Sequence, residues 1–190
     1  RTATTNGTDG DFRFVINGAD IMCRGTNWVP MDVYHSRDKA RYKAALDMVE
    51  DLGCNIVRCW GGNVYEDHEF FDFCDEHGIM VWQDFAMACH CYCQDDWFKE
   101  KLKKEAEWVV TELRDHPSLA VWSGDNENAV HGNDEMEDYT GRKSAYRGIA
   151  SVLYKLDFAR PFLPSSPYGG NKYASNTVGT THNTCYLGSF

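Results

Sequence analysis

The 190-residue sequence lacks an apolar run of membrane-spanning length, a long run of Lys or Arg, and the basic and apolar regions of a signal peptide. Its formal net charge of −10 disfavours binding to a nucleic-acid backbone, which attracts basic surfaces. We therefore expect neither a membrane nor a nucleic acid as a partner. The chain opens with Arg1 instead of Met, and we expect it to be part of a longer protein.

The cysteine spacing of a disulfide scaffold is also missing. Eight cysteines are scattered through strand-like and helix-like segments, at Cys23, Cys54, Cys59, Cys74, Cys89, Cys91, Cys93 and Cys185. This pattern favours free thiols and a cytoplasmic location, although a longer parent protein could be secreted or periplasmic. The cluster Cys89–Cys93 has C-x-C spacing without a second pair, which is not typical of zinc sites. We predict no metal and no cofactor.

What the sequence does contain is enough apolar residues for one domain with a proper core. Hydrophobic residues make up 43% of the chain and aromatic residues 14%. Aromatic side chains can also form the walls of a sugar site, because one face of a pyranose ring is apolar. The composition is therefore compatible with a globular domain that binds carbohydrate.

Apolar periodicity predicts alternating strands and helices after a tail or linker at residues 1–11. Asn17-Gly18 predicts a tight turn between hairpin arms at Phe12–Ile16 and Ile21–Arg24. The predicted strands are Gly25–Met31, Asn55–Trp60, Ile79–Phe85, Leu119–Trp122 and Phe162–Pro167, with a possible sixth at Thr180–Tyr186. The predicted helices run from Ser36 as N-cap to Leu52, from Glu66 or Asp67 to Gly78, from Asp95 or Asp96 to His116, and from Arg142 to Leu156.

Alternating strands and helices with short connections predict a parallel sheet with right-handed crossovers. An open doubly wound sheet would carry a glycine-rich phosphate turn, and Gly61-Gly62-Asn63 lacks the G-x-G-x-x-G spacing. A (β/α)₈ TIM barrel instead carries polar functional residues at the ends of successive strands. We predict such a barrel over residues 12–190, truncated after five or six strands and preceded by the short hairpin.

The strand ends carry the polar and aromatic residues that a barrel active site requires. In chain order these are Asn27 and Trp28, Arg58 and Trp60, Trp82 and Asp84, Asn126 and Glu127, Ser165 and Ser166, and His182 and Tyr186 on the possible sixth strand. Each has an ordinary explanation, such as core packing for the Trp residues or helix capping for Asp84. Their joint occurrence at one rim favours a functional site, because an interior Arg and Asp would otherwise be buried without purpose.

Several of these segments together resemble one known family. They are Gly25–Met31, Val57–Gly62 with Tyr65–Asp67, Val81–Phe85, His116–Trp122, Asn126–Asn128 and Pro164–Pro167. In this order they are similar to the catalytic barrel of β-mannosidase-like members of glycoside hydrolase family two. The resemblance covers nearly the whole chain from the hairpin onward, and it is specific for the family more than for the sugar.

The resemblance implies a retaining mechanism with two carboxylates. Glu127 would be the acid/base, Asn126 would bind the sugar 2-hydroxyl, and Arg58 would orient the nucleophile. A partly desolvated strand end near Trp residues favours the protonated form that a general acid needs. The resemblance and the strand-end positions together suggest a set of substrate-binding residues: Trp60, Asp84, Trp28 and Tyr186.

The family's nucleophilic Glu follows the seventh strand, which lies beyond the strands predicted here. We therefore expect a parent exo-glycosidase that hydrolyses terminal β-linked sugars, with this polypeptide alone inactive. Two open sheet edges also predict self-association. The alternatives are another family-two activity (β-galactosidase, β-glucuronidase or exo-glucosaminidase) and a non-catalytic carbohydrate-binding module. A thiol or metal protein built on Cys89–Cys93 is a third, less favoured alternative.

Overall fold

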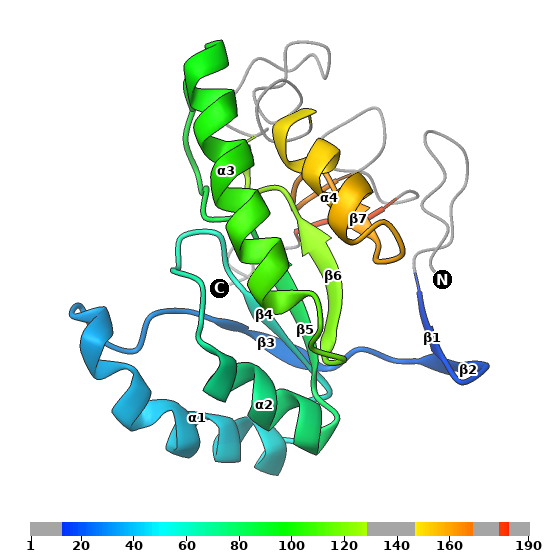
Figure 1. Ribbon diagram of the computed structural model, residues 1–190. Helices are drawn as coiled ribbons and strands as arrows, with labels where there is room; N and C mark the ends of the chain where they lie inside the picture. Colours follow the sequence, from blue (N-terminus) through cyan, green and yellow to red (C-terminus); the bar gives the residue numbers. More distant parts are fainter. Residues whose placement is uncertain (1–12, 129–146, 169–178, 183–190) are drawn as a thin grey trace, which may run out of the picture.

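The computed structural model describes residues 13–128, 147–168 and 179–182. In this part of the chain a two-stranded hairpin precedes a five-stranded parallel sheet, and helices cover one face of that sheet (Figure 1). None of the helices in the described residues has the length and apolar character that crossing a bilayer requires. The sheet and its helices form part of an α/β barrel, which confirms the predicted fold class.

The hairpin consists of β1 (Phe14–Ile16) and β2 (Ala19–Ile21), which pair antiparallel. Asn17 and Gly18 form the turn with φ values of 52° and 83°. Two consecutive residues with positive φ are typical of the tight turn that matches the twist of hairpin strands. The sequence prediction of a hairpin at Asn17-Gly18 is confirmed, although the second arm, Ala19–Ile21, lies closer to the turn than the predicted Ile21–Arg24.

The parallel sheet has the strand order β3-β4-β5-β6-β7, so each strand lies beside its neighbours in chain order. The strands are β3 (Gly25–Trp28), β4 (Ile56–Cys59), β5 (Met80–Asp84), β6 (Leu119–Ser123) and β7 (Phe162–Leu163). Of the expected sixth strand, only residues up to His182 are described. There Thr180 pairs with Tyr168 in a single antiparallel bridge, so the described part adds no parallel strand.

The helices follow the predicted apolar stripes. They are α1 (Lys39–Asp51), α2 (His68–His77), α3 (Asp96–Leu113) and α4 (Ala150–Leu156), with a 3₁₀ turn η1 (His35–Arg37) before α1. Asp67 caps α2 by accepting a hydrogen bond from the Glu69 amide at 3.1 Å, and Gly78 ends it with a φ of 68°. The fourth helix was expected from Arg142, but residues 142–146 lie outside the described part.

The prediction that Ser36 caps the first helix was wrong. Ser36 lies inside the 3₁₀ turn η1, and α1 begins after Asp38. The buried Asp38 carboxylate lies 2.7 Å from His35 Nδ1, an ion pair that holds the 3₁₀ turn against the helix start. The 3₁₀ turn therefore places Ser36 ahead of the helix start, where it does not act as the N-cap of α1.

The apolar core lies between the helices and one face of the sheet. From the sheet it takes Val57, Cys59, Val81, Leu119 and Trp122, and from the helices Leu46, Phe70, Phe71, Ala106, Val109 and Val152. In Figure 1, α3 crosses in front of the strands, and α1 and α2 lie side by side below them. The other face of the sheet carries the polar strand-end residues, because successive side chains of a strand point to opposite faces.

Candidate active site

Sheet register decides which strand-end residues meet. Asn27 pairs with Arg58, and Arg58 pairs with Trp82, so these three side chains form one row on the face opposite the helices. Asp84 lies two residues beyond Trp82 and therefore points to the same face. Trp28 pairs with Cys59 in the neighbouring row, which faces the core.

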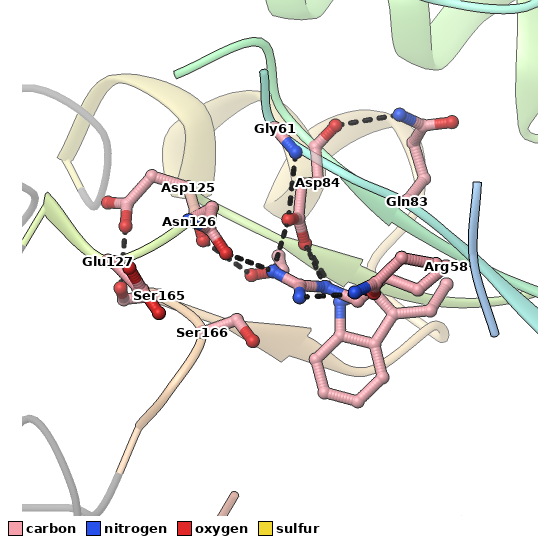
Figure 2. A network of polar contacts seen from close by, with 12 residues as sticks. Arg58, Gly61, Gln83, Asp84, Asp125, Asn126, Glu127, Ser165 and Ser166 are labelled. Carbon is pink, nitrogen blue, oxygen red and sulfur yellow. Dashed lines mark hydrogen bonds and ion pairs between the residues drawn. The ribbon is translucent and has the colours of Figure 1, made fainter. Parts of the chain in front are cut away.

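An ion pair lies at the centre of the polar face (Figure 2). Arg58 Nη2 lies 2.6 Å from Asp84 Oδ2, and Arg58 Nε lies 3.4 Å from Asp84 Oδ1. The Asp84 side chain is completely buried and the Arg58 side chain is 14% exposed. Such a pair requires further hydrogen bonds to offset the cost of removing both charges from water.

Asp84 obtains these hydrogen bonds from the backbone and from its own strand. The Gly61 amide donates to Oδ2 at 3.0 Å, and the Trp82 indole donates to Oδ1 at 2.9 Å. Burial raises the pKa of the Asp84 carboxyl above its ordinary value, whereas the Arg58 guanidinium and the other two donors act in the opposite direction. Because all these hydrogen-bond partners are donors, the site accommodates the ionised carboxylate.

The two glycines after β4 are explained by close approaches at this site. A Cβ on Gly61 would lie 2.3 Å from the Met87 carbonyl oxygen, so only glycine lets its amide reach Asp84. A Cβ on Gly62 would lie 2.1 Å from the Trp60 ring. The sequence Trp60-Gly61-Gly62 therefore places an amide donor at Asp84 and seats the Trp60 ring beside the backbone.

Asn126 connects the ion pair to the loop after β5. Arg58 Nη2 donates to Asn126 Oδ1 at 2.8 Å, and Asn126 Nδ2 donates to Cys89 Sγ at 3.2 Å. The Asn126 backbone amide donates to the Met87 carbonyl at 2.9 Å, and the Cys89 amide donates to the Asn126 carbonyl at 2.8 Å. Side chain and backbone of Asn126 are therefore both fixed.

Glu127 follows with a more open environment. Its side chain is 32% exposed, and Oε1 lies 2.5 Å from His182 Nδ1, whereas Oε2 accepts from Cys89 Sγ at 3.7 Å. Its amide donates to the Ser166 carbonyl at 2.8 Å. Its φ of 59° is unusual for a residue other than glycine, and such backbone strain is concentrated at functional sites.

These side chains surround an open cavity of about 510 Å³. It is lined by Asn27, Arg58, Trp60, Cys89, Asn126, Glu127, Thr181 and His182. Glu127 is the only carboxylic acid among the described residues that line it. A cavity of this size with an aromatic wall, a carboxyl group and several hydrogen-bonding groups is suited to a sugar ring.

A larger cavity of about 760 Å³ lies between the hairpin and the same face of the sheet. Its lining includes Arg13, Phe14 and Met22 from the hairpin side and contains no carboxylic acid among the described residues. It shares Arg58 and Asn27 with the smaller cavity but lacks a proton-transfer group. The smaller cavity is therefore the candidate active site.

The structure brings together most of the predicted site residues. Glu127, Asn126, Arg58 and Trp60 line the cavity, and Asp84 lies behind Arg58. Trp28 lies elsewhere, with its indole donating to the buried Glu66 carboxylate at 2.9 Å on the core side of the sheet. Tyr186 lies outside the described residues.

The sequence analysis did not identify two of the cavity residues, Cys89 and Thr181. Cys89 was expected only as one of the scattered free thiols. Asn27 and His182, which also line the cavity, were expected only as strand-end residues. Cys89 follows β5 closely, so the strand-end rule that identified Asp84 could have included it. Its contact with Glu127 was not predictable, because it depends on a backbone φ of 52° at Cys89.

One group of potential metal ligands occurs elsewhere among the described residues. Asp72, Asp75 and His116 lie on the helix side of the sheet. The Asp75 carboxylate already binds His116 Nδ1 at 2.7 Å and the Ser118 amide at 2.7 Å. We interpret this group as an ion pair that attaches α2 to the start of β6.

Comparison with known proteins agrees with the geometry. The family described as "Glycosyl hydrolases family 2, TIM barrel domain" matches residues 9–166. The chain belongs to glycosyl hydrolase family 2. Within this family it is 38% identical to the β-mannosidase of Bos taurus over 175 residues, which cover 85% of the chain and 20% of that protein. It is 32% identical to β-mannosidase B of Neosartorya fischeri over 188 residues, which cover 90% and 22%.

Two solved structures are also similar to this chain. The β-D-mannosidase of Dictyoglomus thermophilum matches with a TM-score of 0.90 and 37% identity, covering 100% of this chain and 24% of that chain. β-Glucuronidase 3 of Bacteroides uniformis matches with a TM-score of 0.64 and 19% identity over 77% of this chain and 19% of that chain, a likeness of fold. The chain therefore spans only about a fifth of the length of the curated relatives that it matches.

Proposed function

We propose that this chain is the acid/base-bearing part of a retaining exo-glycosidase that acts on terminal β-mannosides. The observation that carries the proposal is the position of Glu127 as the only carboxylic acid among the described residues of a sugar-sized cavity. The similarity to β-mannosidases from an animal, a fungus and a bacterium supports the choice of sugar.

In this proposal Glu127 first protonates the glycosidic oxygen and then, as a base, activates the water that releases the sugar. Trp60 lines the apolar face of the sugar. The Arg58–Asp84 pair fixes the guanidinium next to Asn126, so that the amide of Asn126 is held in one orientation for the 2-hydroxyl. These groups are held before substrate binds, which lowers the cost of ordering the reactants.

We further propose that the 190-residue chain alone has no glycosidase activity. Retaining hydrolysis requires a second carboxylate about 5 Å from the first. Among the described residues, the other buried carboxylates near the cavity are Asp84, which is bound by Arg58, and Asp125, which accepts from Ser165 Oγ at 2.5 Å. Neither is free to attack a sugar carbon. Turnover of an aryl β-mannoside by this chain would contradict this part of the proposal.

The test of the proposed substrate uses a chimera. The chain replaces the segment of the D. thermophilum β-D-mannosidase that it matches over its whole length. We expect the chimera to hydrolyse aryl β-mannosides in preference to β-galactosides and β-glucuronides. An inactive chimera, or one that prefers another sugar, would contradict the proposed substrate.

Within the chimera, Glu127→Gln removes the proton donor. We expect kcat on substrates with poor leaving groups to fall by about 10²–10⁴-fold, because general acid catalysis contributes on that order. Dinitrophenyl glycosides need no protonation of the leaving group, so the first step should be affected much less. Glu107→Gln, an exposed substitution on α3, is the matched control and should leave both rates unchanged. Equal losses on both kinds of substrate would contradict an acid role and favour a binding module.

We also infer that the isolated chain self-associates. Within the described residues the sheet ends at β3 and β7, and Gly25, Thr26 and Asn27 of β3 are exposed. An unpaired strand edge is a template for pairing with another chain. Sedimentation velocity should show oligomers that increase with concentration. A monomer at all concentrations, with β3 amides protected from hydrogen exchange, would contradict this inference.

A further inference from the structure

A continuous chain of hydrogen bonds connects the buried ion pair to Glu127. Arg58 Nη2 donates to Asn126 Oδ1 at 2.8 Å, and Asn126 Nδ2 donates to Cys89 Sγ at 3.2 Å. Cys89 Sγ then donates to Glu127 Oε2 at 3.7 Å. Every donor points in the same direction, from the guanidinium that Asp84 fixes to the carboxylate that opens on the cavity. Hydrogen bonds arranged in such a chain strengthen one another.

Backbone contacts fix the thiol at this position. The Cys89 amide donates to the Asn126 carbonyl at 2.8 Å, and Ala88 pairs with Asn126 in a parallel bridge. Among the described residues other than glycine, three have positive φ: Asn17 in the hairpin turn, Cys89 and Glu127. The two outside the hairpin contact each other. Strained backbone persists only where the surroundings determine it, and here both residues of one contact are strained.

The thiol is also kept in its donating form. Partial burial and the neighbouring Glu127 carboxylate raise the pKa of the Cys89 thiol above its ordinary value, although the hydrogen bond from Asn126 and the charge of Arg58 act in the opposite direction. In a reactive cysteine the donors and cationic neighbours prevail and favour the thiolate. Cys89 is therefore suited to donate a hydrogen bond and not to act as a nucleophile.

We propose that Cys89 is a positioning residue for the acid/base. Its thiol, which Asn126 and Arg58 hold in place, donates a hydrogen bond that fixes the orientation of the Glu127 carboxylate. The proposal rests on the proposed role of Glu127. His182 holds the other carboxylate oxygen at 2.5 Å, so the thiol and the imidazole together fix the plane of the carboxyl group.

The first test measures the contact itself, without activity. The 190-residue chain is alkylated with iodoacetamide across a pH series, and each cysteine is quantified by peptide mass spectrometry. Glu127→Gln should shift the Cys89 profile to lower pH and raise its rate at pH 7.5, because it removes the neighbouring negative charge that raises the pKa of the thiol. Cys93, exposed in the same loop, is the internal control and should not change. An unchanged Cys89 rate would overturn the proposal.

The second test uses the chimera and compares kcat with KM. Cys89→Ala should lower kcat about tenfold on substrates with poor leaving groups and leave KM nearly unchanged, because a misplaced acid slows proton transfer and not sugar binding. Cys89→Ser supplies a hydroxyl donor and should restore most of the rate. A loss of rate in Cys89→Ala that Cys89→Ser does not restore would reduce Cys89 to a packing role and overturn the proposal.

The two tests separate this proposal from the proposed function. If Glu127→Gln leaves the chimera fully active, the acid/base role fails, whereas the alkylation result still reports whether Cys89 contacts Glu127. If Glu127→Gln abolishes activity and the alkylation rate of Cys89 does not respond, the positioning role alone fails.

Discussion

Two glutamates on opposite faces of the sheet show how burial and hydrogen bonding distinguish a structural carboxylate from the one that we propose as the acid/base. Glu66, on the core side, is only 4% exposed. It accepts hydrogen bonds from the Trp28 indole at 2.9 Å, from Asn63 Nδ2 at 3.2 Å and from the Tyr42 hydroxyl. Glu127, on the cavity side, is 32% exposed, and its two oxygens are held by one imidazole and one thiol.

The difference shows what makes a carboxylate available for proton transfer. Glu66 is enclosed by donors that stay in place, so a substrate oxygen could reach it only by breaking the packing between β3, α1 and α2. Glu127 is held by one imidazole and one thiol and has an open side that a substrate oxygen can approach. Asp84 resembles Glu66 in this respect, although it lies next to the cavity. Proximity to a cavity alone therefore does not identify the acid.

The largest effect on stability is expected at Asp84. Asp84→Ala leaves the Arg58 guanidinium, 14% exposed, without its partner. We expect the free energy of unfolding to fall by about 3 kcal/mol, because an unpaired buried charge is costly. Urea denaturation of the 190-residue chain would measure the loss. A loss below 1 kcal/mol would mean that Arg58 reaches water and that Asp84 is less structural than Glu66.

A smaller loss is expected at Glu66. Glu66→Gln replaces one acceptor oxygen by an amide donor that faces the indole and hydroxyl donors of Trp28 and Tyr42. The free energy of unfolding should fall by about 2 kcal/mol, the usual cost of leaving buried polar groups unsatisfied. Glu107→Gln on the exposed side of α3 serves as the control. Equal stability of the two variants would remove the distinction between Glu66 and a surface glutamate.

The partly buried ion pair of Asp75 extends the comparison of structural carboxylates to the pH dependence of stability. Partial burial would raise the pKa of this carboxyl, but hydrogen bonds from Ser118 and His116 lower it below its ordinary value of 3.8. Its charge therefore stabilises the fold fully above about pH 4, and this stabilisation is lost as the pH falls below 3.8 toward the folded-state pKa. Denaturation of the chain and of Asp75→Asn between pH 3 and 6 should show curves that converge toward acid pH. Parallel curves would contradict the lowered pKa.

The smallest effect on stability is expected at the residue with the largest proposed effect on catalysis. Glu127→Gln should change the free energy of unfolding by no more than about 0.5 kcal/mol, because the side chain is partly solvated and the amide can still bind His182. Thermal and urea denaturation of the chain would measure it. A loss comparable with that of Glu66→Gln would erase the contrast between the two glutamates.

Much of this architecture could be predicted from the sequence, because periodicity and strand-end chemistry are local properties. The hairpin turn at Asn17-Gly18 and the partial parallel barrel are confirmed. The sequence could not show which of Asn27 and Trp28 lies on the cavity face of the sheet. Consecutive strand residues point to opposite faces, and only the strand register shows which of the two lies beside Arg58. The Cys89–Glu127 contact was also beyond reach, since it joins two loops through unusual backbone angles.

The left-handed backbone at Glu127 has a consequence for the relatives of this chain. Glycine adopts this conformation without steric cost, whereas a glutamate is strained there and offsets that strain only through its contacts with His182 and Cys89. A relative that kept the barrel only as a scaffold would no longer need the strained glutamate, and we expect glycine or asparagine just beyond β6 in such a protein. The residue at this position therefore distinguishes relatives that keep the proposed proton donor from relatives that keep only the fold.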